Sequence, residues 1–338
     1  MSARESIIPV FVPHLGCPNN CVFCNQRRIS GSQKPADAQT VKDSIELAAA
    51  LPLNGVKRQL AFYGGSFTAI PIEQQTALLD AAKEYMDRGV LHSIRLSTRP
   101  DAIDEDVLNR LKYYGVETIE LGAQSLCDEV LRLTNRGHSA KAVEDASKLI
   151  KQFGFKLILQ MMTGLPGDSM ERSIETAKKI IALKPDGVRI YPTVIVKDTE
   201  LFDMWQAGDY AEHSVEDAVK VCAKLLPLFK DANIPVIRLG LNPTEELSGG
   251  AAAGGAYHPA LGEMVKSEIM LQKASELLAD VEDGSTVTLT VHPSQISQMV
   301  GQRRSNISKL CSRCSLKDVK VKGEAANYDE IQVICVEK

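Results

Sequence analysis

The chain has 338 residues, of which 44% are hydrophobic and 24% are charged, and its formal net charge is −4. This composition is typical of globular proteins and excludes intrinsic disorder and collagen-like structure, and the length suggests two domains or one domain with an appendage. No apolar run reaches the roughly 18–20 residues that cross a bilayer, and the chain begins without a signal-peptide pattern. We therefore expect a cytoplasmic protein with no membrane partner.

Short apolar runs alternate with longer segments of helical period through the first half of the chain. Residues 102–114 are one such helical segment, which we expect Asp101 to cap, and 140–153 and 169–183 are two others. The strands that we predict are 8–13, 58–63, 93–97, 118–121, 156–162 and 187–191. Six strands that are each followed by a helix predict an α/β fold with a parallel sheet, in the form of a partial or open (β/α)6 barrel. Reactive loops then belong at the carboxyl ends of the strands.

The rhythm changes after about residue 194. We predict helices at 214–230 and 261–278, a strand at 235–239, and between them a loop, 248–256, that is too rich in glycine for a regular element. An acidic break at 280–285 predicts a domain boundary. The expected domains are therefore a barrel (1–195), a C-terminal extension of the barrel (196–283) and a small α+β domain (284–338).

Three of the eight cysteines, Cys17, Cys21 and Cys24, have a C-x3-C-x2-C spacing directly after the first predicted strand. Thiolates on one flexible loop can converge on one face of a small inorganic cluster, and sulfur ligands select zinc, Cu(I) or iron–sulfur. A structural zinc site needs a fourth ligand, for which His14 is the only local candidate. The triplet favours a [4Fe–4S] cluster with one open iron, with structural zinc as the alternative.

Further motifs follow the later strands in order, and together with the cysteines they resemble the radical S-adenosylmethionine (SAM) superfamily. After the second and third strands come Gly64-Gly65-Ser66-Phe67-Thr68 and Ser97-Thr98-Arg99-Pro100-Asp101. The fourth and fifth strands lead into L-G-A-Q-S, N-R-G-H and G-L-P-G, and the sixth ends in R-I-Y-P-T. The S-T-R-P-D and Y-P-T segments, and Y-H-P-A-L-G-E at 257–263, are similar to the catalytic subunit of Elongator.

The resemblance implies a radical SAM partial barrel whose cofactors are a [4Fe–4S] cluster and SAM. In that superfamily the open iron holds the amino and carboxylate groups of SAM, and an electron cleaves the sulfonium to release a 5′-deoxyadenosyl radical. The cluster ligands implied are Cys17, Cys21 and Cys24. The residues implied to position SAM are Gly64, Gly65, Ser66, Gln124, Arg136 and Gly164. A solvated surface charge is the alternative for Arg136.

Two departures from known relatives narrow the activity. The Elongator family spaces its first cysteines more widely, and the chain has no room for that family's acetyltransferase domain, which makes acetyl or carboxymethyl transfer doubtful. Porphyrinogen-oxidising relatives carry acidic residues where Ser97 and Gln160 stand here.

The last segment, 285–338, has eight Lys and Arg residues and five Asp and Glu residues, so it is locally basic. Its expected order of strand 287–291, helix 294–299, turn 301–304, helix 306–312 and strand 319–322 resembles a KH domain, whose turn clamps single-stranded RNA. The RNA contacts implied are Gly301, Arg303, Arg304 and Lys309, although Arg304 replaces the usual second glycine. A packing or dimerisation module is the alternative, and Cys311 and Cys314 could alternatively hold an auxiliary cluster.

We therefore expect a radical SAM enzyme, a transferase or related activity that modifies a base of tRNA or rRNA and takes electrons from a reducing partner such as flavodoxin or ferredoxin. A radical SAM enzyme for a small metabolite, and a non-catalytic RNA-binding protein with a structural metal, remain as alternatives.

Overall fold

Seven parallel strands form the main sheet of the computed structural model, which describes residues 5–13, 17, 21–31, 34, 36–51 and 55–337. The strand order is β1-β2-β3-β4-β5-β6-β8, so neighbours along the chain are neighbours in the sheet. The strands are β1 (Glu5–Phe11), β2 (Lys57–Tyr63), β3 (Ser93–Thr98), β4 (Val116–Gln124), β5 (Lys156–Thr163), β6 (Gly187–Pro192) and β8 (Val236–Leu239). The predicted partial barrel is confirmed, and β8 extends it by one strand.

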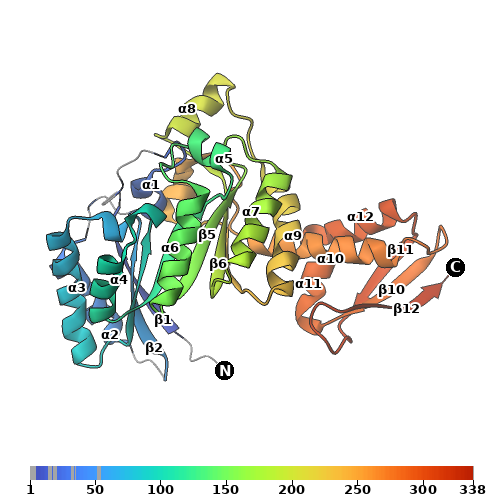
Figure 1. Cartoon of the computed structure of the whole chain (residues 1–338). Helices are drawn as coiled ribbons and strands as arrows, with labels where there is room; N and C mark the ends of the chain where they lie inside the picture. The colour runs from blue at the N-terminus through green and yellow to red at the C-terminus, as the bar shows by residue number, and fades with distance from the viewer. Residues whose placement is uncertain are drawn as a thin grey trace. The chain divides into compact units, whose positions relative to one another are not determined.

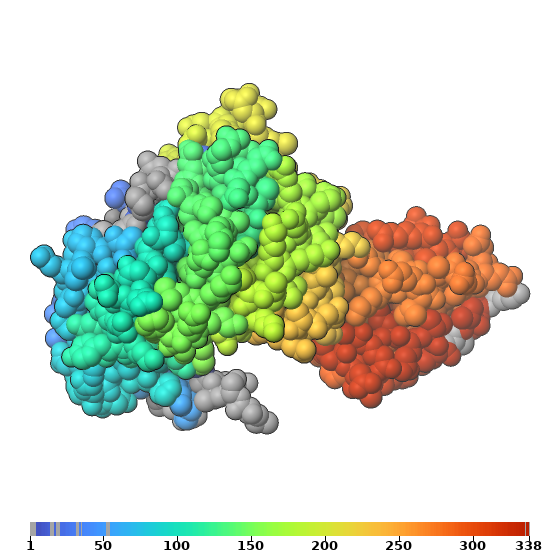
Figure 2. All heavy atoms as spheres, in the orientation of Figure 1, coloured from blue at the N-terminus to red at the C-terminus, as the bar shows by residue number. Residues whose placement is uncertain are grey.

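The helices that follow these strands cover the outer face of the sheet (Figure 1) and hide it in the space-filling view (Figure 2). Each helix buries one apolar stripe, as α6 does with Val143, Ala146 and Ile150, and Ser139 caps it by accepting from Ala142 N. The helices are α2 (Ala38–Ala49), α3 (Ile72–Asp87), α4 (Glu105–Tyr113), α5 (Asp128–Leu133), α6 (Ala140–Gln152), α7 (Met170–Ala182), α8 (Glu200–Ala207) and α9 (Val215–Asp231). The opposite, inner face of the sheet is left to line a cavity.

Two local predictions were wrong. Asp104, not Asp101, caps α4, because a short 3-10 turn (Pro100–Ala102) follows β3 before the helix begins. The glycine-rich segment is also partly regular: β9 (Ala252–Gly255) pairs antiparallel with β7 (Val194–Val196). Gly255 has φ +80, and a Cβ there would meet the carbonyl of Thr193, so glycine permits this close strand pairing.

The chain divides into two compact units, one of residues 1–214 and 225–257, the other of residues 215–224 and 258–338. The break at 280–285 lies inside the second unit. This unit contains a three-stranded sheet in the order β11-β10-β12, with β10 (Thr286–Val291), β11 (Asp318–Lys322) and β12 (Ile331–Glu337). Its helices are α10 (Leu261–Leu277), α11 (Ile296–Val300) and α12 (Ser305–Arg313).

The core of the second unit is shared by its sheet and helices. Leu271 of α10, Leu289 of β10 and Leu310 of α12 are fully buried in one cluster. Two helices connect β10 to β11, and the two strands pair in parallel, as a crossover connection permits, whereas β12 returns antiparallel. Within the described residues, no helix is long and apolar enough to cross a membrane.

Candidate active site

A cavity of about 1140 Å³ opens on the inner face of the main sheet, and most of the predicted site residues line it. Alternate residues of a strand face the same side, so β4 contributes Thr118, Glu120, Gly122 and Gln124. The predicted residues that line the cavity are Cys17, Cys21, Cys24, Gly64, Gly65, Ser66, Gln124 and Arg136. Gly164 is not among the lining residues.

The cysteine loop is anchored where it enters the cavity. Val22 donates a backbone hydrogen bond to the carbonyl of Thr134 (3.2 Å) and accepts one from Leu201 (2.8 Å). Cys21 and Phe23 are buried in a cluster with residues of α5, α8 and the loop after β5. Cys24 N–H donates to Cys21 O (3.0 Å), which closes a tight turn between the two thiols. This packing fixes Val22 and Phe23, which lie between Cys21 and Cys24, while both thiols line the cavity.

Burial raises the pKa of Cys17, and it raises the pKa of Cys24 to about 12. Both thiols are therefore protonated at neutral pH unless a cation holds them as thiolates. Among the described residues, no three His, Cys, Asp or Glu side chains converge closely enough to hold a single metal ion. His14 lies outside the described residues. Cys17, Cys21 and Cys24 all line this cavity, and soft thiolate ligands suit an iron–sulfur cluster.

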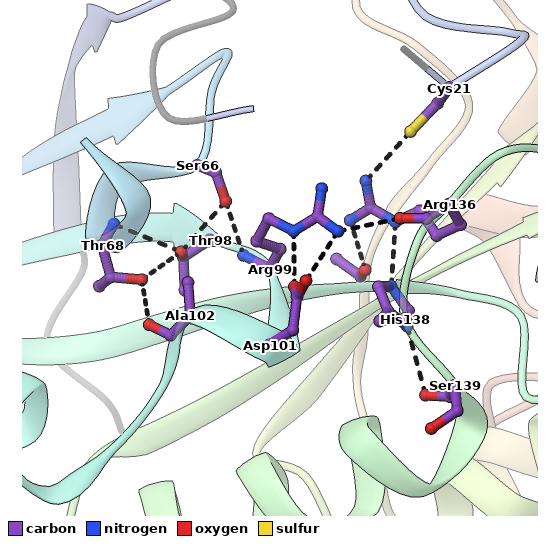
Figure 3. Close-up of polar contacts among 11 residues, drawn as sticks. Cys21, Ser66, Thr68, Thr98, Arg99, Asp101, Ala102, Arg136, His138 and Ser139 are labelled. Carbon is purple, nitrogen blue, oxygen red and sulfur yellow. Dashed lines mark hydrogen bonds and ion pairs between the residues drawn. The ribbon is translucent and has the colours of Figure 1, made fainter. Parts of the chain in front are cut away.

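The residues after β2 and β3 are joined by a hydroxyl network at the cavity rim (Figure 3). Ser66 Oγ accepts from the backbone N–H of Arg99 (3.0 Å), and Thr68 Oγ1 lies 2.6 Å from Thr98 Oγ1. Thr68 also donates to the carbonyl of Ala102 (2.6 Å). Gly64 begins this loop with φ +87, a conformation that favours glycine. The network therefore holds the glycine pair against the end of β3.

Arg99, near which we expect the acceptor to enter, also organises this part of the site. Its side chain is 2% exposed and makes a forked ion pair with Asp101, at 2.5 and 2.9 Å. It also donates to the backbone carbonyl of Arg136 (3.0 Å). Burial acts to raise the pKa of Asp101, but the Arg99 hydrogen bonds outweigh it and hold this pKa below its usual value. Arg99 Nη1 is buried without a hydrogen-bond partner among the described residues, and it extends away from Asp101.

Arg136 lies between the end of β4 and the cysteine loop. Its guanidinium donates to Gly122 O (2.7 Å), Cys21 Sγ (3.5 Å) and His138 Nε2 (3.0 Å). Burial, reinforced by the Arg136 charge, lowers the pKa of His138 to about 4. The imidazole is therefore neutral at pH 7, with Nε2 as the acceptor from Arg136 and Nδ1–H directed at the carbonyl of Ser139. Arg136 is thus a positioned cation and not a solvated surface charge.

Gln124 ends β4 in a left-handed backbone conformation, with φ +63, which is uncommon for a residue other than glycine. Such local strain is typical of functional positions. A Cβ at Gly122 would meet the side-chain nitrogens of both Gln124 and Arg136, so the two polar groups flank the bare backbone of Gly122. The end of β4 therefore presents an amide and a guanidinium side by side.

Gly164 has a structural role that the sequence did not predict. It has φ +73, its N–H donates to Asp168 Oδ2 (2.9 Å), and its carbonyl accepts from Tyr210 (2.5 Å). The ring of His213 occupies the space that a Cβ would take. The side chain of His213 therefore packs directly against the turn after β5, and a larger residue than glycine does not fit at position 164.

Gly164→Ala is expected to destabilise the first unit by about 1–2 kcal/mol from the left-handed backbone alone, and by more because His213 must move. Urea unfolding followed by fluorescence of the single tryptophan, Trp205, measures this. Gly249→Ala is the matched control, because a Cβ there meets nothing within 4 Å. Equal midpoints for the two variants would contradict the packing described.

A buried ion network crosses the middle of the cavity, and the sequence analysis missed it. The carboxylate of Glu120 is fully buried and accepts hydrogen bonds from side chains of four other strands. The donors are Tyr63 (3.1 Å), Arg95 (3.0 Å), Gln160 (3.0 Å) and Arg189 (2.9 Å). The sequence did contain a signal for this network, since β3, β4 and β6 each carry a charged residue at an inward position. Strands of a parallel sheet are normally apolar throughout, so such charges indicate a polar interior.

The network keeps Glu120 ionised. Burial acts to raise the pKa of this carboxyl, but the positive charges of Arg189 and Arg95 outweigh burial and hold the pKa below its usual value. Burial and the Glu120 charge raise the pKa of Tyr63, so the phenol stays a donor. The amide of Gln160 must turn its nitrogen to the carboxylate, which leaves its oxygen as an acceptor.

The predicted RNA contacts lie together in the second unit. Gln302, Arg303 and Arg304 form an exposed turn after Gly301, and Lys309 is exposed one turn further along α12. Arg303 and Arg304 are both left-handed, with φ +51 and +62. Asn306, which is buried, holds the turn by donating to the carbonyls of Ser267 (2.9 Å) and Gln298 (3.2 Å).

The second cysteine pair does not share one environment. Cys311 is in α12, Cys314 follows the end of that helix, and both are partly buried against the core of the second unit. No third His, Cys, Asp or Glu ligand joins them among the residues that the structure describes. The side chain of Cys335, a further cysteine of this unit, lies outside the described part of the chain.

Comparison with known proteins identifies a family and several relatives of this chain. Residues 11–180 match the family described as the radical SAM superfamily, and residues 185–270 match the radical SAM C-terminal domain. Elongator complex protein 3 of Homo sapiens is 32% identical over 192 residues, which are 51% of this chain and 35% of that protein. The tRNA uridine(34) acetyltransferase of Methanocaldococcus infernus is 32% identical over 185 residues, which are 49% of this chain and 35% of that protein. The match thus spans about a third of the length of these relatives.

Solved structures share the fold. The archaeal Elp3 of Methanocaldococcus infernus superposes with a TM-score of 0.61 at 24% identity, and covers 81% of this chain and 64% of that one. Coproporphyrinogen III oxidase of Escherichia coli gives 0.50 at 20% identity, over 68% of this chain and 53% of that one.

Proposed function

This chain belongs to the radical SAM superfamily, and we propose that it is an RNA-modifying enzyme of that superfamily. The resemblance predicted from the cysteine triplet and the ordered strand-end motifs is therefore confirmed. The cofactors of the superfamily are a [4Fe–4S] cluster and SAM. The observation that carries the proposal is that the three thiols, the glycine pair, Gln124 and Arg136 all border one cavity at the carboxyl ends of parallel strands.

The residues present fit these cofactors. In this proposal Cys17, Cys21 and Cys24 hold the cluster, and the cationic side chains of Arg99 and Arg136 favour the thiolate form of their neighbours. The unpaired, buried Nη1 of Arg99 and the guanidinium of Arg136 suit an anionic group such as the carboxylate of SAM. When bound, the [4Fe–4S] cluster and SAM would supply reductive cleavage of the sulfonium to a 5′-deoxyadenosyl radical.

The remaining site residues bind and orient. Gly64, Gly65 and Ser66 let the backbone approach the methionine amino group, and the Ser66 hydroxyl is fixed by Arg99 N–H. Gln124 offers an amide beside Arg136 for the ribose or methionine of SAM. Gly164 shapes the turn expected near the adenine. Neutral His138 orients Arg136 and is not proposed to transfer a proton.

An RNA substrate is supported by the second unit and by the relatives. Arg303 and Arg304 lie in an exposed turn with left-handed backbone, and Lys309 is exposed on α12 that follows. No ion pair neutralises these three among the described residues. Elongator-type relatives include an enzyme named for tRNA uridine. We propose that this KH-like turn contacts single-stranded RNA backbone and that electrons come from flavodoxin or ferredoxin in the cytoplasm, where thiols stay reduced.

Mass spectrometry of total RNA nucleosides from cells with and without the gene tests the substrate. The expected result is one modified nucleoside that disappears with the gene and returns with the wild-type gene, but not with a Cys21→Ala gene. Unchanged nucleosides, together with 5′-deoxyadenosine formation by the purified protein, would instead assign the radical chemistry to a small metabolite.

Replacing both Arg303 and Arg304 by Gln is expected to weaken RNA binding and to lower the slope of log K against log salt by roughly 1.4, since each lost single-strand phosphate contact removes about 0.7. Replacing Lys320 and Lys322 by Gln is the matched control. Both lysines lie in the same unit, where Lys320 pairs with Glu337 of β12 and Lys322 with Glu324 in the segment after β11. Equal slopes for the two variants would remove the turn from the RNA interface.

A further inference from the structure

The wall of the cavity formed by β6 and β8 carries two arginines that are neighbours in the sheet. Arg189 of β6 pairs in register with Arg238 of β8, and both line the cavity. Like charges on directly neighbouring strand positions destabilise a sheet. That Arg189 and Arg238 lie side by side therefore indicates a negative charge that compensates their repulsion.

The protein itself does not supply that charge in full. Arg189 shares the carboxylate of Glu120 with Arg95, which also pairs with Glu5 (3.5 Å). Arg238 donates its Nε–H to the carbonyl of Gly240 (3.0 Å), and no carboxylate lies within ion-pair distance of it among the described residues. Five basic and three acidic side chains line the whole cavity, in a chain whose net charge is −4. Positive charge is therefore concentrated here.

Tyr191 completes this wall. It lies one inward position above Arg189 on β6 and lines the same cavity. Burial raises the pKa of Tyr191, so the phenol remains a hydrogen-bond donor, although the charges of Arg189 and Arg238 act in the opposite direction. The N–H groups of two guanidinium groups and the O–H of a phenol are thus available as donors, a set that matches an oxyanion.

We propose that Arg189, Arg238 and Tyr191 bind the carboxylate or phosphate of a small organic anion, as a second ligand of the cavity beside SAM. The cavity volume of about 1140 Å³ exceeds the roughly 300–1000 Å³ that holds one drug-sized ligand, so a second ligand has room. The Arg189 side chain is only 13% exposed and sits at mid-strand, a depth that a free anion reaches more easily than a phosphodiester flanked by two riboses.

Isothermal titration of the reconstituted full-length protein with malonate and, separately, with inorganic phosphate tests this. Arg238→Gln is the informative variant, because a change of Arg189 would also remove one of the two arginines that pair with buried Glu120. We expect Arg238→Gln to weaken binding of the better probe by about tenfold or more and Arg238→Lys to weaken it less. The control Lys148→Gln removes an exposed charge on the outer helix α6 and should leave the affinity within twofold.

Each titration is repeated in the presence of saturating SAM and, separately, in the presence of a single-stranded oligoribonucleotide. No reductant is added to any of them, so a failure of radical chemistry does not affect the measured affinities. Binding that persists with SAM and falls in Arg238→Gln supports the inference. Loss of probe binding when SAM is added would mean that the arginines take the cofactor's own carboxylate. Two further outcomes would also overturn the inference. One is that the oligoribonucleotide binds but neither malonate nor phosphate does. The other is that wild type, Arg238→Gln and Tyr191→Phe bind the probe with equal affinity.

Discussion

Replacing any one of Cys17, Cys21 or Cys24 by alanine is expected to remove the [4Fe–4S] cluster and to lower 5′-deoxyadenosine formation by roughly 100-fold or more. The physical reason is that the three thiols are the ligands that this cavity offers, whereas changes in residues behind a metal ligand already cost about 10–100-fold. Iron content and the electron paramagnetic resonance signal after anaerobic reconstitution and dithionite reduction measure the first effect. Chromatography of the nucleoside product measures the second.

The matched control is the double variant Cys311→Ser and Cys314→Ser, which removes the other close cysteine pair of the chain. Its iron content and product formation should equal those of the wild type. Two observations would overturn the assignment: an alanine variant of the triplet that keeps a full cluster, or wild-type protein that binds one zinc ion at these thiols and no iron. A loss of iron in the control would revive the auxiliary cluster.

Glu120→Gln is expected to lower the free energy of unfolding of the first unit by about 3–5 kcal/mol. The substitution removes the carboxylate that Arg95 and Arg189 share, and their side chains are only 10% and 13% exposed. Arg95 keeps a pair with Glu5 (3.5 Å), but Arg189 has no second carboxylate among the described residues, and an unpaired buried charge is costly. The substitution also gives Gln160 a donor in place of an acceptor. Urea unfolding followed by Trp205 fluorescence measures the change.

Two milder variants calibrate this measurement and keep it informative if Glu120→Gln does not fold. Tyr63→Phe removes one neutral donor to Glu120 and should cost about 0.5–1.5 kcal/mol. Glu117→Gln on the same strand breaks a pair with Lys156, which is 51% exposed, and should cost at most about 1 kcal/mol. Equal effects of Glu120→Gln and Glu117→Gln would show that the network contributes no more than a surface pair.

The same network predicts a pH dependence. Because the pKa of Glu120 is lower in the folded than in the unfolded chain, its contribution to stability is fully present above the unfolded value near 4.5 and is lost as the pH falls through the folded value. The stability difference between wild type and Glu120→Gln should therefore be constant from pH 7 to about 5 and shrink below about 4.5. A difference that grows on acidification would reverse the assigned direction.

The network also gives the cavity its depth. The carboxylate of Glu120 accepts hydrogen bonds from side chains of four other strands. It thereby fixes the positions of Arg189 and Gln160, which line the cavity together with the cysteines. Because these hydrogen bonds hold Arg189 and Gln160 in place, this side of the cavity is preorganised before any ligand enters. The predicted loss of stability in Glu120→Gln should accordingly be accompanied by weaker binding of the anionic probe.

Local sequence was enough to determine the strand and helix order of the barrel and the cofactor class. Period-2 and period-3.6 patterns depend on the side chains of one element, and the C-x3-C-x2-C spacing depends on a single loop, so both can be seen without a fold. The same holds for the Gly301–Arg304 turn, which lies within a short helix–turn–helix segment. The cap of α4 was missed because Asp101 forms its ion pair with Arg99, a contact that competes with capping.

What only the tertiary structure decided are the groups that come from distant strands. Glu120, Arg95 and Arg189 are far apart in sequence, and each alone is an unexpected charge in a strand. Their meeting depends on the parallel register, which places Arg95 of β3 one inward position before Glu120 and Arg189 of β6 one inward position after it. The same register sets Arg238 beside Arg189. Pairing between strands is decided by non-local contacts, so the cysteine loop could be predicted from the chain and the polar cavity beneath it could not.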